Sequence, residues 1–440
     1  MEHPTPRTAA PAPLATPASP PSDGVPAPIP STPPADGAAK GERLTRLGPL
    51  VFLANFGWML PVAVSGTLIP ALLTEIDPAQ KVTLYGTLTS IGAAVSLIAN
   101  IFFGALSDRT RSRFGSRSPW ILAGGLIAAV TLVTLSVATT FWAVLLGWTV
   151  FQLGLNAFLS SLVAVTPDRV APERRGTIST VTAFGVLLAQ SLGSVVGAAF
   201  LSEARTGLRV APWLLAFAAV AFVVLAPDRP NIGVARAPLS ARTLLRTFAV
   251  PMDRDFLCAL FGRFLLLLAY LLVLLYQLFI LTDYLHLSEG RAASLIATIG
   301  IIGAVTSGGA AAVSGPLSDK LGRRKILVVL SSVLIALAAV VPAVFPSVAG
   351  LLVFMAVGGV AYGIYNAVDA ALMTEVLPSD DDHGKDMGVL NVANTGSQVL
   401  APVVASLILG AGLGYRGLFV TSSVLALASC LFILPINRVR

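Results

Sequence analysis

Charge is scarce in this sequence. Asp, Glu, Lys and Arg make up 12% of its 440 residues, whereas hydrophobic residues make up 55%. A soluble domain is about one quarter charged, because charged side chains cover its surface. The shortage of charge therefore excludes an ordinary soluble protein and indicates a protein that lies in a lipid bilayer.

Cysteine and histidine are rare too, with two and three residues. Cys258 and Cys430 form neither a disulfide framework nor a metal-ligand spacing, and no two histidines form a ligand pair. The sequence also contains no phosphate-binding glycine loop and no nucleophile with a matching base. We therefore expect no enzyme activity, no metal and no cofactor.

Twelve apolar runs are long enough, at about 20 residues, to cross a bilayer as helices. The predicted spans are residues 48–73, 84–107, 119–138, 141–166, 177–200, 210–226, 257–282, 292–313, 325–345, 349–377, 387–410 and 416–436. The longest internal loop separates the sixth run from the seventh. We predict an all-α membrane protein with a six-helix bundle over 44–226, a cytoplasmic linker over 227–256 and a second six-helix bundle over 257–440.

The basic residues that give the chain a net charge of +7 lie in short loops between the apolar runs. This placement argues against binding to nucleic acid, which needs a continuous basic face. With the N-terminus inside, 24 of the 29 Lys and Arg residues fall on the cytoplasmic side, if Arg263 is counted with the central loop. Such a bias sets the orientation of membrane proteins. We expect a multi-pass protein of the cell membrane with both termini in the cytoplasm.

Proline is concentrated at the start of the chain, where the first 40 residues hold twelve of the 30 prolines. A segment of this composition buries too little apolar surface to fold. It also lacks the continuous apolar core of a signal peptide. We predict a disordered cytoplasmic tail over residues 1–43, with either a regulatory role or no selected role.

A charged loop motif occurs twice. Gly104–Trp120 reads GALSDRTRSRFGSRSPW, and Gly315–Lys325 reads GPLSDKLGRRK, so the pattern G-x-L-S-D returns after 211 residues. The pair Asn156-Ala157 returns as Asn366-Ala367 after 210 residues. Two marks at nearly one period indicate a duplicated chain, which is typical of transporters built from repeats.

These motifs resemble those of the major facilitator superfamily over residues 47–436. DRTRSRFGSRSP, TPDRVAPERRG, VDAALMTEVLP and GKDMGVLN are similar to segments of its glycoside–pentoside–hexuronide and sucrose symporter-like branch. The resemblance implies a monomeric secondary transporter with two six-helix bundles. It implies alternating access, with a sugar or glycoside as the small-molecule substrate and a coupling cation, expected to be a proton, as partners.

The resemblance also implies that the repeated loop is a gate, in which Asp108 contacts a helix end and loop arginines while the small Gly104 lets helices approach closely. The alternative is that the arginines only set the topology. The residues assigned to the gate are Gly104, Asp108, Arg109, Arg111, Arg113, Gly115, Arg117, Asp168, Arg175, Gly315, Asp319, Gly322, Arg323 and Arg324.

Polar and aromatic residues inside the predicted spans are candidates for binding substrate near the midplane. They are Asn55, Trp58, Gln152, Asn156, Gln190, Tyr270, Gln277, Tyr362, Tyr365, Asn366, Asn391, Asn394 and Gln398. Amides and aromatic rings suit a neutral hydroxylated ligand, but membrane amides also join helices to one another. The strongest candidate is the stripe of Tyr362, Tyr365, Asn366 and Asp369, which share one face of a helix.

Asp369 alone among the acids lies well inside a predicted span. Sugar–proton symporters of the branch named above use an embedded acid in the first half, and this chain departs from that pattern. We expect Asp369 to be an isolated carboxylate that carries the coupling proton, or else a structural ion pair or hydrogen-bond acceptor. An exporter of hydrophobic small molecules and a non-transporting sensor are the alternative functions.

Overall fold

The computed structural model describes residues 44–171, 174–232, 253–321, 323–375 and 383–436. The predicted tail over residues 1–43 and most of the predicted linker, residues 233–252, lie outside this part. Over the described residues the secondary structure is helical, with no strand. Twelve helices in this part are long and apolar enough to cross a membrane, which confirms the predicted fold class.

The first half contains six of these spans. Its elements are α1 (Leu44–Ile76), α2 (Lys81–Arg109), α3 (Ser118–Leu135), α4 (Phe141–Arg169), α5 (Arg175–Ala199), η2 (Leu201–Glu203), α6 (Ala204–Val210) and α7 (Trp213–Leu225). The sixth span consists of η2, α6 and α7 together. Within this half α1 packs on α5 and α7, and α4 packs on α2 and α3.

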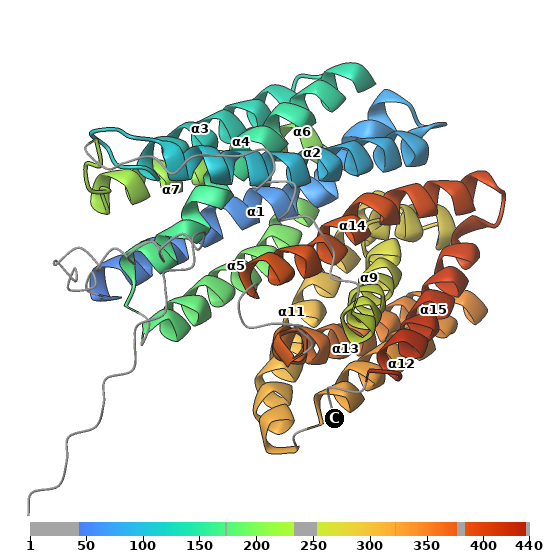
Figure 1. Ribbon diagram of the computed structural model, residues 1–440. Coiled ribbons are helices and arrows are strands. Elements are labelled where there is room, and N and C mark those ends of the chain that lie inside the picture. Colours follow the sequence, from blue (N-terminus) through green and yellow to red (C-terminus); the bar gives the residue numbers. More distant parts are fainter. Residues whose placement is uncertain (1–43, 172–173, 233–252, 322, 376–382, 437–440) are drawn as a thin grey trace, which may run out of the picture. The chain divides into compact units, whose positions relative to one another are not determined.

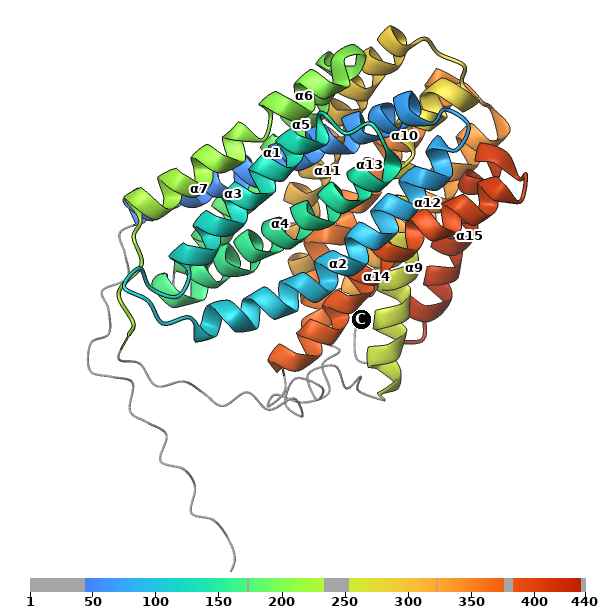
Figure 2. The same cartoon turned by 90° about the horizontal axis from the view of Figure 1, so that it is seen from above.

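The second half repeats the pattern. Its elements are α9 (Arg254–Leu274), α10 (Gln277–Phe279), η3 (Ile280–Tyr284), α11 (Glu289–Leu321), α12 (Arg324–Val344), α13 (Val348–Glu375), α14 (His383–Gly410) and α15 (Gly414–Ile433). Here α13 packs on α11 and α12, and α15 packs on α9 and α12. Figure 1 shows the two bundles, which meet where α5 packs on α11 and α2 packs on α14. Figure 2 shows α2 beside α14.

Glycines allow close helix crossings in both halves. A Cβ at Gly124 of α3 would lie 2.6 Å from the carbonyl oxygen of Gly154 on α4. A Cβ at Gly363 of α13 would overlap the backbone carbonyl of Ser307 on α11. Helices in lipid gain their association energy from such close packing, because burial from water does not drive it there.

Apolar packing between the halves is concentrated at one end of the helices. We call the end where α2 begins the Lys81 end, and the end where α2 finishes the Arg117 end. One buried cluster joins Leu68 and Tyr85 of the first half to Tyr276 and Phe279 of the second. A separate cluster lies within the second half, around the beginnings of α9 and α12. The two halves therefore pack against each other at the Lys81 end.

Candidate functional site

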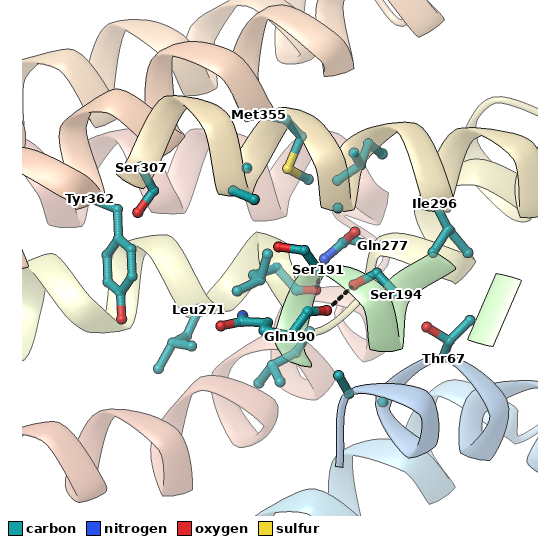
Figure 3. Close-up of a pocket in the computed structure, with 18 of the residues that line it drawn as sticks. Thr67, Gln190, Ser191, Ser194, Leu271, Gln277, Ile296, Ser307, Met355 and Tyr362 are labelled. Atoms are coloured by element: carbon teal, nitrogen blue, oxygen red, sulfur yellow. Dashed lines mark hydrogen bonds between the residues drawn. The ribbon is translucent and has the colours of Figure 1, made fainter. Parts of the chain in front are cut away.

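A cavity of about 450 Å³ lies between the two halves (Figure 3). Helices α1, α2 and α5 line it from the first half, and α9, α10, α11, α13 and α14 line it from the second. Its polar and tyrosine lining residues are Thr67, Tyr85, Gln190, Ser191, Ser194, Tyr270, Gln277, Ser307, Tyr362, Asn366 and Gln398. The volume falls within the usual range for small-molecule sites, about 300–1,000 Å³.

The lining of this cavity is uncharged: no Asp, Glu, Lys or Arg of the described residues belongs to it. Amides and hydroxyls provide donors and acceptors, and the rest is apolar. The apolar side includes Leu187, Leu271, Leu274, Leu275, Leu278, Ile296, Ile299, Met59 and Met355. Such a lining suits a ligand without net charge, because an ion placed there would lose its hydration without gaining a counter-charge.

Tyrosine rings form a stack beside the cavity. Tyr270 of α9 and Tyr362 of α13 are nearly parallel, with ring centroids 4.6 Å apart and an angle of 12° between the planes. Tyr365 continues the stack, with its centroid 6.4 Å from that of Tyr362. The first two tyrosines line the cavity, whereas Tyr365 is fully buried behind them.

The seventh span is broken at the cavity, so the prediction of a continuous helix over 257–282 is wrong. Helix α9 ends at Leu274, and a short turn and a π-helical segment follow. The side chain of Gln277 donates to the carbonyl of Leu274 across the break, at 2.9 Å, and the hydroxyl of Tyr276 donates to the carbonyl of Pro402, at 3.3 Å. Broken helices and π-helical turns occur often at transport and binding sites.

Six of the sequence-predicted substrate residues line the cavity: Gln190, Tyr270, Gln277, Tyr362, Asn366 and Gln398. Four others make contacts outside it. Asn55 donates to the carbonyl of Val51 and accepts from Trp58. Asn156 donates to Ser96 on α2 and to the carbonyl of Gln152. Asn156 therefore joins α4 to α2, which is the alternative role of a membrane amide, whereas both bonds of Asn55 lie within α1.

The remaining candidates lie apart from the cavity or outside the described part. Asn394 does not line it, and the side chain of Asn391 is not among the described residues. Five polar lining residues were not predicted from the sequence: Thr67, Tyr85, Ser191, Ser194 and Ser307. Ser194 follows Gln190 by one turn of α5, so a search for small hydroxyls around each amide would have found it.

Asp369 forms an ion pair, so the expectation of an isolated carboxylate is wrong. Its Oδ2 lies 3.0 Å from Nη1 of Arg263, and the side chain of Asp369 is buried while that of Arg263 is 16% exposed. Arg263 belongs to α9 rather than to the central loop, because that helix begins at Arg254, about 14 Å earlier along its axis. The pair lies inside the second half, and neither residue lines the cavity.

The Lys81 end is closed by polar and aromatic contacts between the halves. Nζ of Lys81 lies 2.7 Å from Asp283, whose other oxygen accepts a hydrogen bond of 3.0 Å from Tyr415. At the same end, the ring of Tyr85 makes edge-on contacts with the rings of Tyr276 and Phe279, at centroid distances of 5.6 and 5.7 Å. Since Tyr85 also lines the cavity, these rings separate the cavity from the Lys81 end.

The Arg117 end of the first half carries a charge network. Arg117 pairs with Asp108 at the end of α2 and, at 2.8 Å, with Asp168 at the end of α4. Partial burial opposes its charge, but the two carboxylates outweigh burial and raise the pKa of Arg117 above its usual value. Asp228, which follows α7, accepts from the backbone N–H of Arg117 at 3.0 Å and pairs with Arg169.

Asp228 also explains the glycine in this loop. Gly115 has a φ of +80°, and a Cβ there would overlap the Asp228 carboxylate. Gly115 was predicted from the sequence to belong to the gate, whereas no role was predicted for Asp228. By contrast, Gly104 makes no close crossing, since a Cβ would lie 3.9 Å from the nearest atom, Ser160, so the expected close approach is wrong.

Other gate candidates make local contacts or lie outside the described part. Arg111 donates to the carbonyls of Asp108 and Thr110, and Arg175 donates to those of Pro167 and Val170. Arg113 stacks on Phe114. A Cβ added at Gly315 would meet no atom within 4 Å, so this glycine makes no close helix crossing. The side chain of Asp319 and the whole of Gly322 lie outside the described part.

Comparisons with known proteins agree with this architecture. The family model described as "Major Facilitator Superfamily" matches residues 47–314 and 259–440. Among solved structures, a bacterial homologue of the human lysosomal transporter Spinster, in an inward-facing and occupied conformation, superposes with a TM-score of 0.67 at 15% identity, covering 90% of this chain and 96% of that one.

Two further structures share the fold. A mutant of the nucleoside transporter NupG has a TM-score of 0.69 at 16% identity, covering 89% of this chain and 98% of that one. The human organic anion transporter MFSD10 has a TM-score of 0.61 at 19% identity, covering 89% and 99%. No curated protein sequence matches the chain.

Proposed function

Because the chain belongs to the major facilitator superfamily, we propose that it is a secondary transporter for a small neutral solute, a sugar or a glycoside. The observation that carries this proposal is the uncharged cavity between the halves, lined by amides, hydroxyls and a stacked tyrosine pair. Sugar hydroxyls pair with such amides, and the C–H faces of a sugar ring pack against aromatic rings.

The closed Lys81 end supports an assignment of conformation. The halves, over residues 44–226 and 257–440, would rock about the cavity during transport. With both termini in the cytoplasm, the Lys81 end faces outward, and the structure corresponds to an inward-facing state in which the outer passage is shut. The cell membrane is the compartment that we assign to the protein.

A binding screen tests the substrate class. Purified protein is heated with sugars, aryl glycosides and hydrophobic drugs, since a ligand that binds the folded state raises its melting temperature. Asn366→Ala removes a cavity amide and should abolish the shift, whereas Asn394→Ala removes an amide that does not line the cavity and should keep it. Equal loss of the shift in both variants, or no shift with any sugar or glycoside, contradicts the proposal.

Export of a hydrophobic compound is the second candidate function. The leucine, isoleucine and methionine side chains on one part of the cavity favour it, because methionine and aliphatic residues accommodate apolar ligands of varied shape. The same screen separates the two functions. Stabilisation by drugs alone, retained in Asn366→Ala, would assign the cavity to hydrophobic compounds.

We further propose that transport is driven by a proton bound at Asp369. This buried acid lies one turn beyond Tyr365 and Asn366 on the helix that lines the cavity. Its ion pair with Arg263 is compatible with coupling, because protonation would cancel the attraction. In liposomes, Asp369→Asn should retain exchange of the sugar identified in the screen and lose accumulation driven by a pH gradient. Accumulation at the parent level would make Asp369 purely structural.

A further inference from the structure

Three buried polar atoms without a hydrogen-bond partner lie around one ion pair in the second half. They are Nε of Arg263, Oδ1 of Asp369 and the hydroxyl of Tyr365. The ion pair itself uses the other ends of the two charged groups, Nη1 and Oδ2. Buried polar groups in folded proteins are nearly always hydrogen-bonded. Three unpaired polar atoms in one cluster therefore indicate that the cluster binds a further ion or group.

The charged groups around Asp369 restrict the chemical identity of the ion or group that this cluster binds. Arg263 on α9 and Tyr365 on its own helix are the groups that act on the carboxylate, and the described parts of α11, α12 and α14 contribute no other charged group. A metal cation at Oδ1 would meet the positive guanidinium nearby and would need several oxygen ligands at once. A proton needs only the one free carboxylate oxygen.

Tyr365 connects this cluster to the cavity. It precedes Asp369 by one helical turn, so the two side chains share a face and interact electrostatically. Its ring is 1% exposed and stacks on Tyr362, which in turn stacks on Tyr270. In a close-packed interior the buried ring cannot move independently of Tyr362.

We propose that Tyr365 is the positioning residue through which the state of the cavity controls protonation of Asp369, and that the bound cation is a proton. This inference rests on the proposed transport function. A solvent proton binds Oδ1, the resulting O–H donates to the hydroxyl of Tyr365, and the neutral carboxyl releases the guanidinium of Arg263. A ligand that shifts Tyr362 shifts Tyr365 with it, so ligand and proton each change the affinity for the other.

The test uses protons alone as the probe, so no substrate is needed. Spin labels at Phe114 and Lys320, both exposed, report the distance between the halves at the Arg117 end in purified full-length protein without its two native cysteines. The distance distribution is measured against pH. The parent should show one titration midpoint, and Asp369→Asn should show none.

Tyr365→Phe is the decisive variant. It should lower the midpoint by about one pH unit, because the protonated carboxyl of Asp369 loses the hydroxyl to which it donates. The matched control is Tyr284→Phe, which also removes a tyrosine hydroxyl bonded at 2.9 Å, to Pro342, but lies away from the cavity. The control should keep the parent midpoint.

The outcomes separate this inference from the proposed function. A flat response in Asp369→Asn with an unshifted midpoint in Tyr365→Phe overturns the role of Tyr365 alone. A pH response that survives in Asp369→Asn, or is missing in the parent, overturns proton coupling at this site. A distance change on replacing potassium by sodium at fixed pH overturns the assignment of the proton. If Tyr365→Phe does not fold, Arg263→Lys tests the same unit, and an unshifted midpoint there counts against it.

Discussion

The ion pair between Lys81 and Asp283 should hold the Lys81 end shut, and Asp283→Asn removes it. Both side chains are mostly buried, with 18% and 27% of their surface exposed. Hydrogen bonds to charged groups contribute about 1.5–3 kcal/mol, and partial exposure places this one near the lower limit. Since about 1.4 kcal/mol changes an equilibrium tenfold, the population open at the Lys81 end should rise roughly tenfold.

Labelling of the cavity measures this shift. A cysteine at Ser191, which lines the cavity, is exposed to a membrane-impermeant maleimide added from the side of the Lys81 end, in a protein without native cysteines. Asp283→Asn should raise the labelling rate roughly tenfold, in proportion to the open population. The control is Glu75→Gln, because Glu75 pairs with Arg205 at 3.0 Å near the same end but within one half. Equal rates for the two variants would refute the reasoning.

Three further predictions concern the loops and the packing. A cysteine at Ser116 should be labelled only from the cytoplasm and one at Thr206 only from outside; the opposite result would reverse the orientation inferred from the basic residues. Asp108→Asn should leave the protein inserted but slow transport, because Arg117 loses one of its carboxylates; an unchanged rate at equal surface expression would remove Asp108 from the gate. Gly363→Ala should lower the melting temperature by several degrees, since the new Cβ overlaps a backbone carbonyl of α11, and an unchanged value would contradict that crossing.

The twelve spans were predictable because a membrane helix is defined by a local property, the length of an apolar run. The break in the seventh span was not. Residues 271–284 contain neither Gly nor Pro, the usual marks of a helix break. The break is instead supported by Gln277, which bonds Leu274 across it, and by Tyr276, which bonds Pro402 on another helix. A contact with a distant helix leaves no local signal.

The roles of the site residues also depend on contacts with distant helices, which the sequence does not reveal. Asn156 and Asn366 occupy equivalent places in the repeat, yet Asn156 is buried between α2 and α4 while Asn366 opens on the cavity. Identical residues in identical local patterns acquire different roles from their neighbours in space. Likewise, helical spacing predicted that Asp369 shares a face with Tyr365. The partner of Asp369 in the ion pair, Arg263, lies on another helix. Arg263 had been assigned to the central loop when the basic residues were counted.

The apolar cluster that joins the halves at the Lys81 end has a thermodynamic consequence. Opening that end would separate Leu68 and Tyr85 from Tyr276 and Phe279, and water would reach surfaces that are now dry. Exposure of apolar surface to water raises the heat capacity, so the free energy of opening is curved in temperature and falls on cooling. The balance between the two faces of this transporter therefore depends on temperature even without ligand, and cold favours the state in which the Lys81 end is open.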